Sequence, residues 1–241
     1  MIARAEKTLG SGAPIVLETG KLAKQAAGSI VVSQGETMVL VAAAANDKPS
    51  TFDFFALTCD YRERTYAAGK IPGGYFKREA RPTEHETLTA RLIDRPIRPL
   101  FPKGFSHEVQ IMCTVLSSDG EHDADILAIL GASAALRVSA LPFDDALGAV
   151  RVGCVDGEFI ANPTHEQREL STVDLVVAGT VHGITMMEAG MEDIPESTLL
   201  EAIAFGYEQL KLTIELQEDL ASQAAKPTAD CLLYTSDAAD D

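Results

Sequence analysis

The segment that most constrains the fold of this chain is residues 28–46, GSIVVSQGETMVLVAAAAN. Two apolar runs flank the polar sequence Ser33-Gln34-Gly35-Glu36, an arrangement typical of strands joined by a hairpin turn. Further strand-like runs occupy residues 14–20, 51–61 and 107–117. The first half of the chain is therefore expected to be rich in β-sheet.

A helix is expected to begin at Thr83. Thr83 and Glu86 have the spacing of a capping box, in which each side chain bonds the backbone amide of the other residue. Leu88 and Leu92 are four residues apart and are expected to face the core, and Pro96 is expected to stop the helix.

The second half of the chain repeats the alternation of strands and helices. A helix with Ala and Gly on a face suited to close packing is predicted over residues 123–139. A hairpin around Asp156-Gly157 and paired strands within residues 171–190 follow, and a long helix is predicted over residues 195–222. This order predicts an α+β fold with a largely antiparallel or mixed sheet, and a boundary near Leu141-Pro142.

The 241 residues suffice for a sizeable core. No segment resembles a signal peptide, and the longest apolar run, residues 38–45, is too short to cross a bilayer. The four cysteines lack CxxC spacing and three lie in strand-like runs, which favours buried free thiols. A cytoplasmic, reducing location without membrane contact is expected.

Cations are unevenly distributed along this acidic chain. The net charge of −16 argues against a surface that binds nucleic acid everywhere. Yet ten of the 20 Lys and Arg, and only five of the 36 acidic residues, lie between Arg62 and Lys103. Such segregation indicates a local site for anions.

The segment GKIPGGYFKR (69–78) combines glycines, two aromatic residues and cations. Tyr75 and Phe76 are suited to stacking on bases, and Lys77 and Arg78 to neutralising phosphates. The alternative is a mobile surface loop with its two aromatic side chains tucked into the core.

Arg91 and Arg95 share one face of the helix predicted from Thr83, and Arg98 follows just beyond Pro96. Three guanidinium groups at this spacing offer bidentate donors to successive phosphates. The alternative is a salt-bridged helix end, with Asp94 and Glu86 as the partners of these arginines.

Acidic residues and a histidine cluster in SSDGEHDADI (117–126). They include the residue types that bind metals, but a turn followed by a helix N-terminus explains them better, because acids there cap the helix and complement its dipole. Asp174, a lone carboxylate at the start of an apolar strand, is expected to be a cap or turn residue.

Three segments resemble polynucleotide phosphorylase: AAGKIPGGYFKREARPTEHETLTARLIDRPIRPLFPKGF (67–105), ILGASAAL (129–136) and DLVVAGT (174–180). The similarity runs in register to about residue 228. Members of this family degrade RNA from its 3′ end with inorganic phosphate and release nucleoside diphosphates.

The resemblance implies an RNase PH-like core of βαβα type, with mixed sheets packed against helices, two subdomains and a C-terminal helix. It implies subdomains over residues 1–141 and 142–228, the second including the start of a helical linker. Residues 229–241 are expected to be a non-family tail, disordered or artefactual. The family has two such cores, so this chain is expected to be a truncated first core.

The resemblance also assigns roles to the basic segment. Tyr75, Phe76, Lys77 and Arg78 match a family loop at the entry of the central channel of a trimeric ring. The helix arginines match family residues that contact RNA or phosphate; these are Arg91, Arg95 and Arg98.

The family's phosphate site and its Mg²⁺-linked carboxylates belong to the second core. Asp174 matches one acid of that core, but Val176 and Arg168 stand where the second core has a Lys and another Asp. The resemblance therefore implies no catalytic residue and no metal ligand in this chain.

These features lead to two functional hypotheses. One is the first core of a phosphorolytic 3′→5′ exoribonuclease of mRNA degradation, which guides single-stranded RNA while Mg²⁺ and inorganic phosphate act in the second core. The other is a non-catalytic RNA-binding and ring-forming module. The resemblance further implies a homotrimer and RNA-degradation complex proteins as partners.

Overall fold

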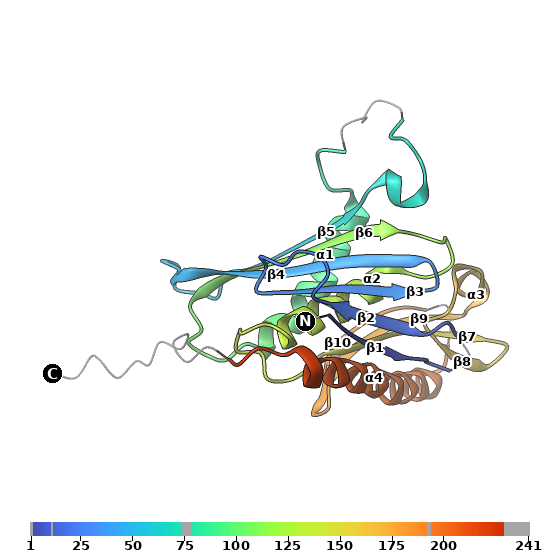
Figure 1. Ribbon diagram of the computed structural model, residues 1–241. Coiled ribbons are helices and arrows are strands. Elements are labelled where there is room, and N and C mark those ends of the chain that lie inside the picture. Colours follow the sequence, from blue (N-terminus) through green and yellow to red (C-terminus); the bar gives the residue numbers. More distant parts are fainter. Residues whose placement is uncertain (1, 11, 74–78, 192–193, 229–241) are drawn as a thin grey trace.

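The protein is described by a computed structural model over residues 2–10, 12–73, 79–191 and 194–228. Two β-sheets, four α-helices and two short 3₁₀ helices make up this part of the chain (Figure 1). The α+β class, with sheets packed against helices and a C-terminal helix, is confirmed.

The larger sheet has six strands in the order β1-β2-β3-β4-β6-β5. Neighbouring strands are antiparallel except β5 and β6, which are parallel, so this sheet is mixed. The hairpin turn expected within residues 33–36 is confirmed: Gln34 pairs with Thr37, and Gly35 has a φ of 58°. The strands are β1 (Ala3–Lys7), β2 (Ile15–Thr19), β3 (Gly28–Gln34), β4 (Thr37–Pro49), β5 (Leu57–Glu63) and β6 (His107–Ser117).

The smaller sheet has four antiparallel strands in the order β10-β9-β7-β8. Asp156 and Gly157 join β7 to β8 with φ angles of 53° and 83°, as a two-residue hairpin loop with both central residues left-handed requires. The strands are β7 (Gly148–Val155), β8 (Glu158–Ala161), β9 (Val173–Thr180) and β10 (Gly183–Met191).

The four helices are α1 (Glu84–Ile97), α2 (Ala124–Arg137), α3 (His165–Leu170) and α4 (Glu196–Ala224). Helix α2 is buried along most of its length and packs against β3 and β4 of the larger sheet and β7 of the smaller one. A Cβ at Gly131 would come within 2.6 Å of Val41 and 2.7 Å of Val32, so the small residue permits the close packing expected from the sequence.

Helix α4 runs along β7, β9 and β1 (red in Figure 1). Its Gly206 packs against Val152 and Val177, and the side-chain amide of Gln217 donates to the carbonyl of Leu147 at 2.8 Å. Within the described residues, no helix is both long and apolar enough to cross a membrane.

Several sequence-based expectations were wrong in detail. The strand expected from residue 51 begins at Leu57, and strand β1 and helix α3 had not been expected. Helix α1 runs through Pro96 to Ile97, because the proline removes one hydrogen bond in the last turn while the amide of Arg98 still bonds the carbonyl of Asp94. Leu92 is buried as expected, but the side chain of Leu88 is 53% exposed.

The free thiols are confirmed for the three cysteines that the structure describes. Cys113 and Cys154 are buried and Cys59 is half-buried. Burial raises the pKa of Cys59 and of Cys113. Cys231 lies outside the described residues.

Two smaller elements are the 3₁₀ helices η1 (Thr65–Ala68) and η2 (Arg98–Leu100). Helix η1 follows β5 directly, and η2 follows α1. Helix η1 therefore lies where β5 ends and α1 begins, whereas η2 lies at the other end of α1, near the start of β5.

Candidate functional site

A capping box fixes the start of α1, the helix that carries Arg91 and Arg95 and is called the arginine helix below. The Thr83 amide donates to Glu86 Oε2 at 2.6 Å, and the Glu86 amide donates to Thr83 Oγ1 at 3.1 Å. Glu86 Oε1 also accepts the amide of Glu63, at the end of β5, at 2.8 Å. This buried carboxylate therefore ties the start of α1 to the edge of the larger sheet.

Arg91 and Arg95 lie on an exposed face of α1, as the spacing predicts. Arg95 approaches Glu188 of β10 at 3.8 Å, and both side chains are more than half exposed, so this ion pair is weak. Arg91 forms no ion pair within the described part of the chain. Both guanidinium groups are therefore available to an anion.

Arg98 is engaged in the fold instead. Its guanidinium donates to both carboxylate oxygens of Asp94, at 3.2 and 2.7 Å, and to the carbonyls of Phe55 and Leu57 at 3.0 and 3.1 Å. It also lies 5.9 Å from the centroid of the Phe55 ring. The salt-bridged helix end therefore describes Arg98, with Asp94 but not Glu86 as its partner.

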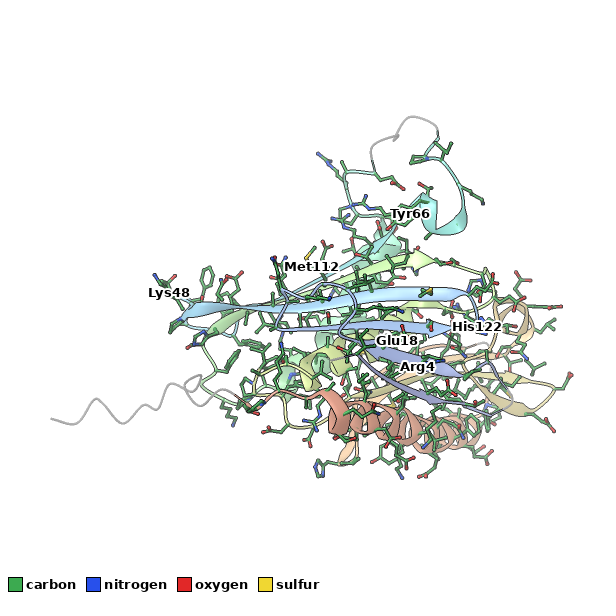
Figure 2. All side chains as sticks on the ribbon, viewed as in Figure 1. Arg4, Glu18, Lys48, Tyr66, Met112 and His122 are labelled. Atoms are coloured by element: carbon green, nitrogen blue, oxygen red, sulfur yellow. The ribbon has the colours of Figure 1, made fainter. Side chains whose placement is uncertain are left out.

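Tyr75, Phe76, Lys77 and Arg78 lie outside the described residues. The structure describes the chain up to residue 73 and again from residue 79, and this part of the chain follows the end of β5 (Figure 1). Figure 2 shows Tyr66 on this part of the chain; its side chain is 55% exposed, and it is a further aromatic residue that the motif did not single out.

The two ends of this segment are held together. Arg64 donates to the carbonyl of Glu79 at 2.6 Å, and the Thr65 amide donates to Glu79 Oε1 at 2.9 Å. The Thr65 hydroxyl bonds the same oxygen, and these hydrogen bonds lower the pKa of Glu79. Residues 64–65 and 79 thus form a clamp, which we call the Arg64–Glu79 clamp.

A cleft lies beside the arginine helix. It has a volume of about 380 Å³ and lies between α1, β9 and β10. One wall carries His85 and Leu88 of α1, and Glu188 of β10 is at the same rim as Arg95. The opposite wall is an ionic cluster, formed by Asp123, Asp125, Arg151, Arg168 and Asp174, of which all but Asp123 line the cleft.

Arg151 of β7 is the centre of this ionic cluster. Its Nη2 lies 2.6 Å from Asp125 Oδ2, and its Nη1 bonds Asp174. Its Nε lies 3.1 Å from Asp123 Oδ2, but at an angle that makes no hydrogen bond. One buried guanidinium therefore faces three carboxylates.

Arg168 of α3 closes the cluster from outside. It donates to Asp123 Oδ2 at 2.7 Å and to Asp174 Oδ2 at 2.9 Å. His165 Nε2 also lies 2.8 Å from Asp123 Oδ1. Each carboxylate in the cluster is therefore paired with at least one guanidinium.

Burial and charge act in opposite directions on these acids. Burial raises the pKa of Asp125, which Arg151 partly offsets and Asp123 reinforces. For Asp174, burial also favours the neutral form, but Arg151 and Arg168 outweigh it and hold the pKa of Asp174 below its ordinary value. Burial alone would lower the pKa of Arg151, yet its three acidic neighbours raise it.

These acids are a poor fit for a divalent cation. Mg²⁺ binds through carboxylate oxygens that remain accessible to it and its waters. Here those oxygens face guanidinium groups, and the described residues contain no group of three or more His, Cys, Asp or Glu arranged to hold a metal ion. The cluster is suited to fixing β7, β9, α2 and α3 together.

Two expectations about these acids need correction. Asp174 is not a cap or turn residue but lies within β9, and its carboxylate is shared by two arginines. Asp123 occupies the N-cap position of α2 but makes no capping hydrogen bond, because its carboxylate pairs with arginines instead. Sequence reasoning missed Arg151; its signal was a lone cation in the apolar strand AVRVGCV, which requires acidic partners when buried.

The turn expected at residues 117–122 is confirmed. Asp119 Oδ1 accepts the amides of Glu121 and His122 at 2.8 and 3.0 Å, and the Thr37 hydroxyl at 2.8 Å. Burial would raise the pKa of Asp119, but these hydrogen bonds and that from His122 Nδ1 outweigh it and lower the pKa strongly. This carboxylate organises a turn.

Comparison with protein families decides the assignment. Residues 12–142 match the model of the 3′ exoribonuclease family, domain 1, and residues 145–209 match that of the 3′ exoribonuclease family, domain 2. The chain belongs to the RNase PH family of 3′ exoribonucleases. Its fold and the resemblance drawn from the sequence are thereby confirmed.

Several curated relatives are about half identical to this chain. Polyribonucleotide nucleotidyltransferase 1 of Alkaliphilus metalliredigens is 49% identical over 238 residues, which cover 98% of this chain and 34% of the relative. The polyribonucleotide nucleotidyltransferase of Sulfurihydrogenibium sp. is 51% identical over 221 residues, or 91% and 31% of the two chains. This chain thus spans about a third of the length of these relatives.

Solved structures share the RNase PH fold at low sequence identity. Rice Rrp46 superposes with a TM-score of 0.72 and 14% identity, covering 90% of this chain and 98% of Rrp46. A chain of the Archaeoglobus fulgidus exosome with RNA bound to the active site gives a TM-score of 0.64 and 18% identity, covering 91% and 87%. These likenesses establish the fold.

Proposed function

We propose that this chain acts as the first core of a phosphorolytic 3′→5′ exoribonuclease, where it binds and guides single-stranded RNA. The observation that carries the proposal is the exposed face of Arg91 and Arg95, beside a cleft whose aspartates are already paired with Arg151 and Arg168. Anion binding is thus available on α1, while the aspartates of the cleft are committed to arginines. The names of the relatives support the same reaction class.

In this reaction an oxygen of inorganic phosphate attacks the phosphorus of the 3′-terminal phosphodiester. The bond to the 3′-oxygen of the preceding nucleotide breaks, that oxygen takes a proton, and a nucleoside diphosphate leaves. Mg²⁺, when bound, supplies positive charge to the phosphoryl oxygens. We assign both Mg²⁺ and phosphate to a second core, which lies beyond this chain.

The part assigned to this chain is delivery of the strand. Arg91 and Arg95 neutralise backbone phosphates, and Tyr75 and Phe76 stack on bases beside Lys77 and Arg78. Arg98 contributes indirectly, because it holds the end of α1 against β5 through the carbonyls of Phe55 and Leu57. The assembly we propose is a homotrimeric ring in the cytoplasm, working on mRNA with other RNA-degradation proteins.

A second candidate is a non-catalytic RNA-binding and ring-forming module when the chain is isolated. The pairing of Asp174 with two arginines favours this second candidate. Phosphoryl transfer needs a cation at the reacting phosphate, and a carboxylate that two arginines already neutralise does not hold a metal cation there.

Both proposals are tested with labelled poly(A). The chain is incubated with poly(A), phosphate and Mg²⁺, and ADP release is followed while binding is measured by fluorescence anisotropy. We expect binding without ADP release. Phosphate-dependent ADP release by this chain would overturn the assignment of chemistry to a second core.

The binding face is tested by salt titration of the Arg91→Gln/Arg95→Gln double variant. Each lost phosphate contact is expected to lower the slope of log K against log salt by about 0.7 for a single strand. Arg4→Gln is the matched control, since exposed Arg4 lies on β1 at the opposite edge of the larger sheet from β5. An unchanged slope in the double variant would refute the role of this face.

A further inference from the structure

The two exposed arginines of α1 differ in that an acidic side chain lies beside only one of them. Arg95 Nη1 lies 3.8 Å from Glu188 Oε2, whereas Arg91 forms no ion pair within the described residues. Both arginines are on the same face of the helix. The chain therefore offers its own comparison between an arginine with an acidic neighbour and one without.

The fold places Glu188 at the rim of the cleft. It lies on β10, an edge strand of the smaller sheet, directly opposite Val176 of β9. Directly opposed side chains point to the same face of a sheet, and both of these residues line the cleft. Helix α1 contacts β10, so Arg95 approaches Glu188 from the helix. The acid thus has a defined position next to one of the two arginines.

The contact between Arg95 and Glu188 is weak enough for an anion to displace. The two side chains are 54% and 60% exposed, so water screens their attraction. Their separation of 3.8 Å also exceeds the length of about 2.7–2.9 Å that a charge-assisted hydrogen bond has. A phosphate can therefore bind Arg95, but the carboxylate of Glu188 stays close by and repels it.

This repulsion depends on the charge of the anion, because Coulomb energy is proportional to the product of the two charges. A phosphodiester group of RNA carries one negative charge, whereas inorganic phosphate carries two at mildly alkaline pH. An arginine alone attracts the doubly charged anion more strongly. A neighbouring carboxylate opposes that anion about twice as strongly, in free energy, as it opposes a phosphodiester, and so offsets the preference.

The arginines deeper in the cleft do not restore the preference for a doubly charged anion. The guanidinium groups of Arg151 and Arg168 are shared among three aspartates of the ionic cluster. Their positive charge is therefore already compensated, and Arg95 with Glu188 determines how this rim of the cleft responds to an anion.

We propose that Glu188 is a specificity-determining residue, which makes Arg95 select the phosphodiesters of RNA over free inorganic phosphate. The inference rests on the proposed function, in which inorganic phosphate is a co-substrate and is present wherever RNA is degraded. Without the acid, that phosphate would compete with the strand for the arginine. A group that repels the competitor more than the ligand supplies specificity in this way.

The test is competition for a fluorescent single strand of oligo(A) bound to this chain. Inorganic phosphate, or the singly charged diester dimethyl phosphate, is added at constant ionic strength and mildly alkaline pH, and anisotropy is followed. In Glu188→Gln we expect RNA to bind about two- to fivefold more tightly. The inhibition constant of phosphate should fall by a larger factor than that of dimethyl phosphate. Unchanged RNA affinity, or equal falls for the two competitors, would overturn the proposal.

Three further variants locate the effect. Glu158→Gln removes the same charge from exposed β8, at the opposite edge of the same sheet, and should alter neither RNA affinity nor competition. Glu188→Asp keeps a carboxylate and should keep the discrimination between the two competitors. In an Arg95→Gln background, Glu188→Gln should no longer change the inhibition by phosphate. A full effect without Arg95, or the same effect from Glu158→Gln, would contradict the pairing of Arg95 with Glu188.

Failure of this inference is distinguishable from failure of the proposed function. A lower salt slope in Arg91→Gln/Arg95→Gln together with unaltered competition in Glu188→Gln would refute the inference alone. RNA binding that responds to neither variant would refute the binding face on α1, and the role of Glu188 with it.

Discussion

Arg168 Nη2 lies 2.9 Å from Asp174 Oδ2, and Arg151 binds the other oxygen of the same carboxylate. Both arginines also pair with Asp123. The two guanidinium groups and three aspartates therefore form one connected unit in the wall of the cleft. Arg151 and Asp125 are its buried members, whereas Arg168 and Asp174 stay partly exposed, and the buried pair is the basis of the first prediction.

Arg151→Met should strongly destabilise the protein. It leaves Asp125, which is 8% exposed, without its cation, and breaking a buried ion pair costs about 3–5 kcal/mol. The measurement is the free energy of unfolding in urea. Arg4→Met, which removes a surface pair with Glu6, should cost less than about 1 kcal/mol. Similar losses for the two variants would show that the cluster contributes no more than a surface pair.

Asp119 should make stability depend on pH. Its folded-state pKa is lowered by the amides of His122 and Glu121, so its contribution is present above the unfolded pKa of about 3.9 and is lost as the pH falls through the folded value. We expect Asp119→Asn to lose about 1–3 kcal/mol at pH 7 and the difference to shrink below about pH 4. Urea titrations at several pH values measure this, and a constant difference would disprove it.

Arg98→Lys should lower stability while Arg91→Lys should not. Lysine keeps the charge of Arg98 but loses the planar fork that reaches Asp94, Phe55 O and Leu57 O together. A loss of about 1–3 kcal/mol is expected for Arg98→Lys in thermal or urea unfolding, against less than about 0.5 kcal/mol for exposed Arg91. Identical unfolding curves would mean that the fork adds nothing to the charge.

Gly28→Ala should be poorly tolerated. A Cβ at Gly28, the first residue of β3, would overlap the carbonyl oxygen of Ala135 in α2, and a backbone atom cannot move aside as a side chain does. We expect a loss of about 1–3 kcal/mol or more. Gly190→Ala in β10 is the matched control, because a Cβ there meets no atom within 4 Å. The melting temperatures of the two variants decide the matter, and equal values would contradict the close approach of β3 and α2.

The aromatic pair and the basic pair of the segment should affect RNA in different ways. Tyr75→Ala and Phe76→Ala should each weaken binding of single-stranded RNA by about 1–3 kcal/mol, at any salt concentration. Neutral residues at Lys77 and Arg78 should instead flatten the salt dependence. Anisotropy titrations at several salt concentrations distinguish the loss of affinity from the loss of salt dependence. Unchanged binding in both sets of variants would show that this segment is a surface loop without a role in RNA binding.

Local signals in the sequence predicted local structure well. The capping box of Thr83 and Glu86 and the turn at Asp156-Gly157 each depend on residues at most three apart, and both formed as expected. The prediction that Leu88 is buried was wrong. Its spacing fits a buried face, but the side chain lines the open cleft beside α1. Strand β1 was missed because its mixed sequence, ARAEK, is held by pairing with β2 and packing against α4.

The ionic cluster could not be predicted from the sequence, because its contacts join residues that are far apart along the chain. Arg151 meets Asp125 and Asp174 from 26 and 23 positions away, so neither acid carried a local sign of its partner. The departures at Arg168 and Val176 did indicate an altered acidic site, although not that Arg168 itself would bind Asp174. Family resemblance located the residues, and only the three-dimensional arrangement paired them.

The Arg64–Glu79 clamp has a consequence for how this protein can change over time. Because the segment is pinned at its base, its sequence can lengthen or shorten without disturbing β5 or α1. Each doubling of a flexible loop costs only about 0.6 kcal/mol in closure entropy. The length of this segment can therefore vary independently of the packed core, which makes the clamp a suitable place to graft other recognition sequences.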